Sequence, residues 1–163
     1  MIEGDGIQFE FADHNCFACG SLNTHGLGLL LHLEPGRSWT ALELDRRFEG
    51  WEGIAHGGIT TTILDEVMAW SLVESDNWGV TARLNVQFRR PVPIGTPLRA
   101  DGWLTNVRRR LMDTEARIID VATGVELATA TGVYVAADAD RKREILERYK
   151  FRRLNTAVTG TAG

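Results

Sequence analysis

The sequence lacks any apolar run approaching the roughly 18 residues that a membrane-spanning helix needs. Its opening stretch, MIEGDGIQFEF, has neither the basic segment nor the apolar segment of a secretory signal peptide. It also lacks internal repeats and any stretch with the composition of an interdomain linker. We therefore expect one cytoplasmic domain, and 163 residues are enough to enclose a hydrophobic core.

Net charge is also small. The formal charge is −4, so no general attraction to nucleic acid is expected. Because no apolar run is long enough to span a bilayer, no membrane partner is expected either. Sixteen of the eighteen basic residues are arginine, a residue that suits bidentate contacts to phosphate.

Cysteine is scarce, and the two cysteines form one CxxC pair, Cys16 and Cys19. A zinc site usually takes two well-spaced pairs of ligands. Here His14 and His25 lie nearby but no second pair follows, so we expect no metal ion. A redox pair would open a helix after a strand, and that context is missing. We expect a turn with small buried thiols that caps the sheet.

The hydrophobic pattern predicts strands, one buried helix, and more strands. Period-two alternation or short apolar runs predict strands at 26–35, 39–48, 80–91 and 98–107, with a hairpin turn at 108–113. Residues 114–136 are either two strands joined at 122–124 or one long bent strand. Residues 138–154 are predicted as an amphipathic helix with Asp138 or Asp140 as its N-cap.

The helix predicted from about Gly58 to Ser75 is apolar nearly all round. Asp65, Glu66 and Glu74 are its only charged residues. A helix without a polar face is a buried helix. One antiparallel sheet wrapped around this helix explains both the missing solvent face and the single apolar face of each strand. The sequence therefore predicts an α+β fold.

A glycine-rich loop, 49–58, leads into this helix. The first N–H groups of a helix have no internal partner, and glycine lets a ligand approach them closely. The amide of Gly57 or Gly58 is therefore a candidate oxyanion hole. Asp65 lies roughly 11–13 Å further along the helix axis. That is too far for one helix to use both groups on one carbonyl, so a site made from them needs two antiparallel copies.

These segments carry a family resemblance. The motif HGGITTTILDE, preceded by FEGWEG and followed by VQFRRPVPIGTPL, resembles the hotdog-fold thioesterases, specifically the PaaI-like branch of the 4-hydroxybenzoyl-CoA thioesterase superfamily. The segment NCFACGSLNTHGLGL is similar to the entry segment of that branch. The resemblance runs from about Asn15 to Val135. It implies a five- or six-stranded antiparallel sheet around one long helix, and dimerisation through sheet edges.

The resemblance also implies roles for individual residues. The family hydrolyses acyl-CoA thioesters without a further cofactor, at two sites in a dimer interface. Gly57 matches the oxyanion amide, and His56 matches the neighbour that helps hold the thioester carbonyl. Asp65 matches the acid that acts as nucleophile or general base. Thr81 matches a hydroxyl that positions water, although its strand parity with Arg83 turns it away from the site unless the strand begins irregularly.

Other positions depart from the family or stay open. Several relatives carry Asn or Gln where Glu49 stands, and a carboxylate cannot replace the hydrogen bond that an amide donates. Glu66 is a second candidate for the acting acid. Trp51 and Trp70 either line the acyl tunnel or belong to the core. Two clusters are candidate contacts for CoA phosphates or, alternatively, solvated turns: Arg89 with Arg90, and Arg108, Arg109 and Arg110.

The combined prediction is a homo-oligomeric hotdog acyl-CoA thioesterase, either a dimer or a tetramer. Its parts are a partly loose segment 1–14, the hotdog domain 15–137, the helix 138–154 and a frayed tail 155–163. The alternative is a non-catalytic hotdog protein that binds acyl-CoA or a related ligand. A hotdog hydratase fits less well, because those enzymes usually pair a histidine with an acid at a different spacing.

Overall fold

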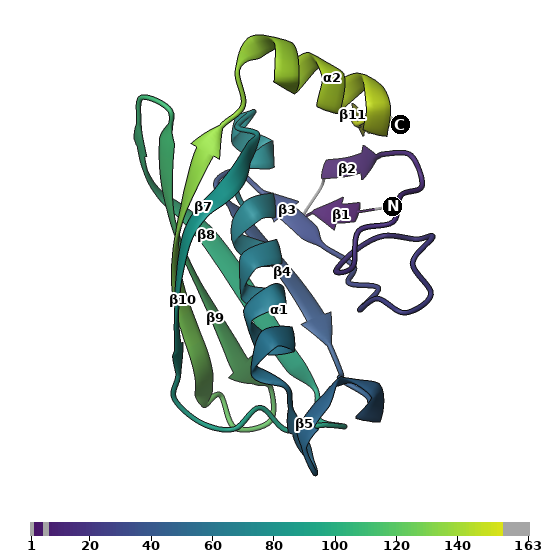
Figure 1. Cartoon of the computed structure of the whole chain (residues 1–163), viewed down its shortest axis with the longest axis vertical. Helices are drawn as coiled ribbons and strands as arrows, with labels where there is room; N and C mark the ends of the chain where they lie inside the picture. The colour runs from purple at the N-terminus through teal and green to yellow at the C-terminus, as the bar shows by residue number, and fades with distance from the viewer. Residues whose placement is uncertain (1, 5–6, 155–163) are drawn as a thin grey trace, which may run out of the picture.

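The computed structural model describes residues 2–4 and 7–154, and its centre is one sheet wrapped around one helix (Figure 1). The sheet has six antiparallel strands in the order β3-β4-β8-β9-β10-β7. Their bounds are β3 His32–Glu34, β4 Arg37–Leu42, β8 Leu98–Arg108, β9 Leu111–Asp120, β10 Glu126–Ala136 and β7 Gly79–Phe88. The predicted α+β architecture is confirmed, and residues 114–136 belong to two separate strands.

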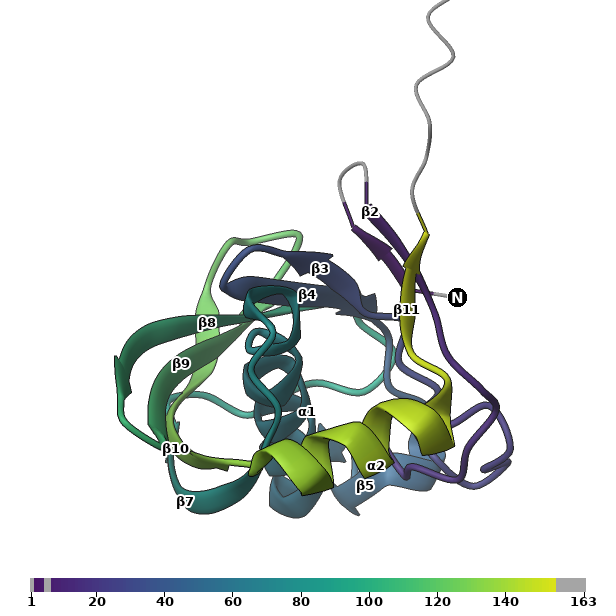
Figure 2. The ribbon, with the colours of Figure 1, turned by 90° about the horizontal axis from the view of Figure 1, so that it is seen from above.

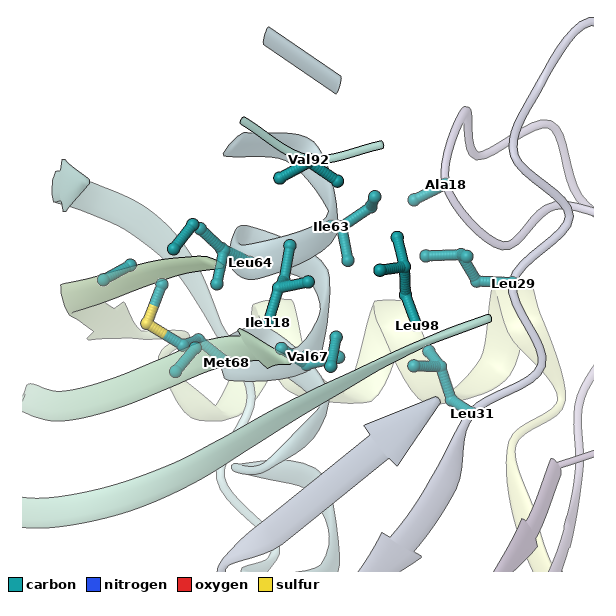
Figure 3. Close-up of a cluster of buried hydrophobic side chains, with 14 of the residues drawn as sticks. Ala18, Leu29, Leu31, Ile63, Leu64, Val67, Met68, Val92, Leu98 and Ile118 are labelled. Atoms are coloured by element: carbon teal, nitrogen blue, oxygen red, sulfur yellow. The ribbon is translucent and has the colours of Figure 1, made fainter. Parts of the chain in front are cut away.

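The central helix, α1, runs from Gly57 to Trp70. Its residues Ile63, Leu64, Val67 and Met68 are fully buried against the sheet. Figure 3 shows them beside Leu98 of β8 and Ile118 of β9. Burying such side chains stabilises the fold by about 1.5–3 kcal/mol each. Of the residues in α1, only Gly57 and Gly58 are classed as exposed, so the predicted burial of this helix is confirmed.

The prediction that α1 continues to Ser75 is wrong. The helix ends at Trp70, and a short 3₁₀ turn, η2 (Val73–Ser75), follows. Asp76 then adopts the left-handed region with φ 59°, a conformation that a continuing helix cannot include. The chain reverses there and enters β7. No helix in residues 2–4 and 7–154 is long and apolar enough to cross a membrane.

The segments before α1 are less regular than predicted. In the predicted strand 26–35, only the residues of β3 pair in the sheet. The predicted strand 39–48 ends early, because β4 stops at Leu42. A 3₁₀ turn, η1 (Arg46–Phe48), follows, with Asp45 accepting from the amide of Arg47 as its N-cap. The loop 49–58 contains a small hairpin, β5 (Glu49–Trp51) and β6 (Ile54–Ala55).

Both ends of the described chain form structure outside the central sheet. Helix α2 spans Ala139–Tyr149, with Asp138 as its N-cap, and lies across the end where α1 finishes (Figure 2). The prediction of helix up to residue 154 is wrong, because Lys150 turns the chain with φ 49° and Arg152–Leu154 form strand β11. Strands β1 (Ile2–Gly4), β2 (Ile7–Glu10) and β11 make a second antiparallel sheet, so residues 2–4 and 7–10 of the segment predicted as partly loose form strands. The tail 155–163 lies outside the described residues.

Candidate functional site

The side chain of Asp65 is held by two hydroxyl groups. Tyr134 of β10 donates to Asp65 Oδ1 at 2.7 Å, and Thr81 of β7 donates to the same oxygen at 2.8 Å. In the part of the chain that the structure describes, no hydrogen bond reaches Oδ2. One oxygen therefore fixes the orientation of the carboxylate, and the other is available for chemistry.

The position of Thr81 depends on a β-bulge. The pairing of β10 with β7 shifts between Val133 and Tyr134, so that Val133 faces Arg83 while Tyr134 faces Thr81. Such a bulge adds one residue to a strand and reverses its parity beyond that point. The strand begins irregularly, and the hydroxyl of Thr81 turns towards Asp65.

Tyr134 is a site residue that the sequence interpretation missed. Along β10, alternate residues face α1, and those preceding Tyr134 on this face are small: Ala128, Ala130 and Gly132. A Cβ at Gly132 would lie 2.8 Å from Thr114 Oγ1 and 3.0 Å from the Tyr134 ring. Burial and the adjacent charge of Asp65 raise the pKa of Tyr134, so its hydroxyl keeps its proton and remains a donor. The sequence does contain a signal for this residue: a single tyrosine follows three small residues at alternate, inward-facing positions of one strand.

At the other end of α1, His56 acts as the N-cap. Its Nδ1 accepts the amide hydrogen of Gly58 at 2.9 Å, so this amide is already used. In the neutral ring, that bond assigns the proton to Nε2, which makes Nε2 a donor. The amide of Gly57 donates to no group among the described residues. The structure therefore favours Gly57 over Gly58 as a free donor, beside the exposed ring of His56.

Gly57 and Asp65 do not meet within one chain. They are eight residues apart on the same helix, or roughly 12 Å along its axis. A Cβ at Gly57 would instead lie 3.5 Å from the ring of Phe88, at the far end of β7 from Thr81. The two halves of the predicted site therefore lie near opposite ends of strand β7.

Glu49 has a structural contact of its own. Its Oε1 accepts the amide hydrogen of Gly53 at 3.0 Å and lies 3.7 Å from Arg46 Nε. The carboxylate closes the β5–β6 hairpin. Trp51 in the same hairpin is 82% exposed, so the core interpretation of this residue is wrong for the single chain.

Glu66 points to a different side of α1 from Asp65. It accepts from Trp70 Nε1 at 2.8 Å, and its Oε1 lies 4.0 Å from Cys16 Sγ. Burial and the charge of Cys16 raise the pKa of Glu66 to about 7. The thiol of Cys19 and the backbone amides of Cys19 and Ala18 lower the pKa of Cys16 to about 5, whereas Cys16 and burial raise the pKa of Cys19. Glu66 and Trp70 therefore line a cavity with the cysteines, away from Thr81 and Tyr134.

The five candidate arginines differ in how their charge is used. Arg89 pairs with Glu126 at 3.1 Å and Arg108 with Asp113 at 2.9 Å. Arg110 donates to the carbonyl of Ala136 at 3.0 Å. Arg90 and Arg109 are exposed, and neither forms an ion pair with any described residue. They are the two candidates whose charge is free to meet a phosphate.

Comparisons with known proteins agree with this architecture. The family model described as Thioesterase superfamily matches residues 52–126. A curated relative, the acyl-coenzyme A thioesterase THEM4 of Mus musculus, is 24% identical over 93 residues, which are 57% of this chain and 40% of that protein. The chain thus spans about two fifths of the length of the curated relatives it matches.

Solved structures extend the agreement to the fold. A crystal structure of a thioesterase superfamily protein has a TM-score of 0.69 and 26% identity, over 74% of this chain and 60% of the other. A mutant of the phenylacetic acid degradation protein PaaI from Thermus thermophilus has a TM-score of 0.62 and 25% identity, over 68% and 95%. These matches show the hotdog fold, and together with the family model they support a relationship to the thioesterase superfamily, of the PaaI-like type.

Proposed function

We propose that this protein hydrolyses acyl-CoA thioesters, with Asp65 as the reacting acid. The observation that carries the proposal is the environment of Asp65. Its Oδ1 is fixed by Tyr134 and Thr81, while Oδ2 has no partner among the described residues. A carboxylate held in this way can deprotonate water or attack a carbonyl carbon without losing its orientation. The name of the THEM4 relative supports the same substrate class.

The reaction needs few groups. Water, deprotonated by Asp65, adds to the thioester carbon, and the carbonyl oxygen becomes negatively charged. The N–H of Gly57 and the Nε2–H of His56 stabilise this oxyanion. The C–S bond then breaks, and CoA leaves as a thiolate, which is a good leaving group. If Asp65 attacks directly instead, water hydrolyses the resulting anhydride, and the same donors serve both routes.

The site is completed by a second copy of the chain. Strand β7 is at the edge of the sheet, and its Val80 and Phe88 are 69% and 57% exposed. A long edge strand with exposed apolar residues presents unpaired backbone groups, which favours pairing with a strand of another chain. Antiparallel pairing of two β7 strands about Leu84 would place Phe88 of the partner subunit opposite Val80. Gly57 of the partner subunit, which lies against that Phe88, would then approach Thr81 and Asp65.

The same arrangement brings the free arginines to the site. Arg109 lies in the hairpin beside the start of β7, and Arg90 follows the end of β7 next to Gly57. Pairing about Leu84 would bring Arg90 of the partner subunit to the end that holds Arg109. Both are then available for the CoA phosphates. A cytoplasmic location stays a prediction from the sequence.

The first test is thiol release from short, medium, long and aromatic acyl-CoAs. The parent should release CoA from at least one class, and the reactive class names the substrate. Asp65→Asn keeps an oxygen for Tyr134 and Thr81 but cannot act as a base, so turnover should be lost with the fold retained. Silence of the parent across the panel, with CoA esters raising its melting temperature, would instead identify the non-catalytic binding protein.

A second test asks whether the site is shared between subunits. Gly57→Pro removes the proposed oxyanion donor, and proline suits the first position of a helix. The preceding His56, with φ −59° and ψ 135°, already has the extended backbone that proline requires of its neighbour. Gly57→Ala, which keeps the N–H, is the matched control.

Mixing the two inactive variants distinguishes the site geometries. A dimer of one Asp65→Asn subunit and one Gly57→Pro subunit has one intact site only if each site uses both subunits. Random reassociation should therefore restore about a quarter of the parental activity, because half of the dimers are mixed and half of their sites are intact. No recovery in dimers shown to have exchanged subunits would contradict the shared site.

A further inference from the structure

A cavity of about 200 Å³ on the cysteine side of α1 has no part in the proposed hydrolysis. It lies between the N-terminal loop, α1 and α2. Its walls are largely aromatic, including Phe11, Trp70 and Trp78, and its polar members are His14, Cys16, Cys19 and Glu66. The four polar side chains therefore lie in a partly open pocket with largely apolar walls, where a charged side chain needs a specific partner.

Three of these polar side chains converge on one point. The thiols of Cys16 and Cys19 and a carboxylate oxygen of Glu66 all lie within 4.8 Å of one another. Tetrahedral zinc, with Zn–S bonds of about 2.3 Å, separates two sulfur ligands by about 3.8 Å. Closing the cluster around an ion thus requires movements of roughly an ångström. The side chains have the rotatable bonds to make them.

The cluster has no cation of its own. Glu66 accepts from the Trp70 indole and lies against Cys16, and it takes part in no ion pair with any residue in 2–4 or 7–154. Two thiolates and a carboxylate gathered in one largely apolar pocket repel each other when ionised. A divalent cation removes that repulsion, and two thiolates with one carboxylate suit zinc.

The backbone holds the two thiols in place. Gly20 donates to the carbonyl of Cys16 at 2.9 Å, which closes the CxxC turn. A Cβ at residue 20 would lie 2.4 Å from the amide nitrogen of Cys16 and 2.5 Å from the carbonyl oxygen of His14, so only glycine fits. Ala18, in the middle of the turn, is buried against the core and accepts from Leu29 at 2.9 Å. Figure 3 shows Ala18 and Leu29 close to Ile63 of α1.

His14 provides a separate indication that a ligand belongs in this cavity. Its Nδ1 accepts the amide hydrogen of Cys16, so in the neutral ring Nε2 carries the proton. Nε2 is buried and has no hydrogen-bond partner among the described residues. A buried donor without an acceptor is costly. Water bound to a metal ion in the same cavity would supply that acceptor.

We propose that Cys16, Cys19 and Glu66 bind one Zn²⁺ ion, whose fourth position is open to the cavity beside His14. The ion joins the N-terminal turn to α1 at the residue next to Asp65. The sequence prediction of no metal site rested on the missing second pair of ligands. The third ligand is 50 residues away from Cys16 and becomes visible only when α1 packs against the turn. A disulfide between the two cysteines is the competing assignment, and it leaves Glu66 and His14 unexplained.

The test measures metal binding directly and does not depend on acyl-CoA hydrolysis. The full chain is purified under reducing conditions, its two free thiols are verified, and bound metal is removed with a chelator. Zn²⁺ is then titrated against a chromophoric competitor. We expect one Zn²⁺ per chain. Co²⁺ in its place should give the intense visible bands of a tetrahedral site and thiolate-to-cobalt charge transfer in the near ultraviolet.

Variants identify the ligands. Cys16→Ser and Cys19→Ser should each weaken zinc binding by at least about 100-fold, because even outer groups of a metal site contribute 10–100-fold. Glu66→Gln keeps an acceptor for Trp70 but should weaken binding at least about tenfold. His25→Ala, an exposed histidine of the same loop, is the control and should bind as the parent does.

Two results would overturn the proposal. In the first, fully reduced parent protein binds no stoichiometric Zn²⁺; if it also forms a disulfide reversibly, the pair is a redox couple instead. Alternatively, Co²⁺ binds without thiolate charge transfer, which would place the ion elsewhere. The cobalt spectrum is measured on the parent, so it decides the question even if a cysteine variant fails to fold.

Discussion

Asp65 and Glu66 are neighbours on α1, yet the two carboxylates lie in different surroundings. One helix step of about 100° turns Asp65 towards the hydroxyls of β7 and β10, and Glu66 towards an indole and two thiols. Two hydroxyl groups fix the orientation of the Asp65 carboxylate, whereas burial raises the pKa of Glu66 to about 7. The residue type is the same, so the partners supplied by each face decide what each acid can do.

The largest expected difference is in turnover. Asp65→Asn should lower kcat by about 10³-fold, because general-base catalysis typically contributes 10²–10⁴-fold. Glu66→Gln should lower kcat by about tenfold at most, which is about 100-fold less than the loss in Asp65→Asn, since the Glu66 side chain points away from the thioester site. The measurement is thiol release by both variants on the best acyl-CoA of the panel. Comparable losses in both, with folding intact, would make Glu66 part of the chemistry and remove the contrast.

The next effect concerns the donor on β10. Tyr134→Phe removes the buried hydroxyl that holds Asp65 Oδ1. A hydrogen bond to a charged group contributes about 1.5–3 kcal/mol, so kcat should fall about 10–100-fold. KM should change little, because Tyr134 positions the acid and does not touch CoA.

Tyr149→Phe serves as the matched control for that measurement. The Tyr149 ring lies at the end of α2 against His14, and its hydroxyl has no contact with Asp65. Its kcat should equal that of the parent. A Tyr134→Phe variant with raised KM and unchanged kcat would show that Tyr134 acts on substrate binding instead.

The Glu66 side of the comparison predicts a pH dependence of stability in reduced, chelator-treated protein. The pKa of Glu66 is about 7 in the folded chain, against 4.5 for an ordinary glutamate. Between these values the folded chain holds a proton that the unfolded chain has released, so the free energy of unfolding falls as pH rises. The loss begins near pH 4.5, is complete above about pH 7, and amounts to roughly 3 kcal/mol.

The measurement compares urea unfolding of the parent and Glu66→Gln at pH 5 and pH 8. Cys16, whose pKa is lowered to about 5, acts in the opposite direction over the same range. For this reason the difference between the two proteins is the relevant quantity. The free energy of unfolding of Glu66→Gln, relative to that of the parent, should increase from pH 5 to pH 8. A constant difference would mean that Glu66 is not desolvated as the structure indicates.

The contrast between the two acids could be predicted from the sequence only in part. The buried helix and the strands that enclose it follow from hydrophobic periodicity, whereas the choice of Asp65 as the reacting acid rests on the resemblance of the HGG motif to the thioesterases and stays a prediction. Tyr134 does not, because it is 69 residues from Asp65 and its hydrogen bond depends on how β10 crosses the helix. The contact between Glu66 and Cys16 also joins segments that are distant in sequence.

The errors have a similar origin. The charge pattern of residues 138–154 fits a helix that runs to residue 154. Arg152–Leu154 instead pair with β2, a strand near the other end of the sequence, and no local pattern indicates that pairing. The orientation of Thr81 depended on a bulge at one position of β7, which period-two counting cannot locate. Local patterns thus predicted which elements form, and long-range pairing decided which side chains meet.

The smallest expected effect is at Thr81, the exposed donor to Asp65. Thr81→Val keeps the shape of the side chain but removes its hydrogen bond at 2.8 Å. Exposure lets water replace the lost hydroxyl, so kcat should fall by only about 3–10-fold, corresponding to a net hydrogen bond of about 0.5–1.5 kcal/mol. Thr81→Ser, which keeps the hydroxyl, should restore most of the parental kcat. If Thr81→Val lost as much as Tyr134→Phe, burial would not be what separates the two donors, and Thr81 would have to contact the attacking water itself.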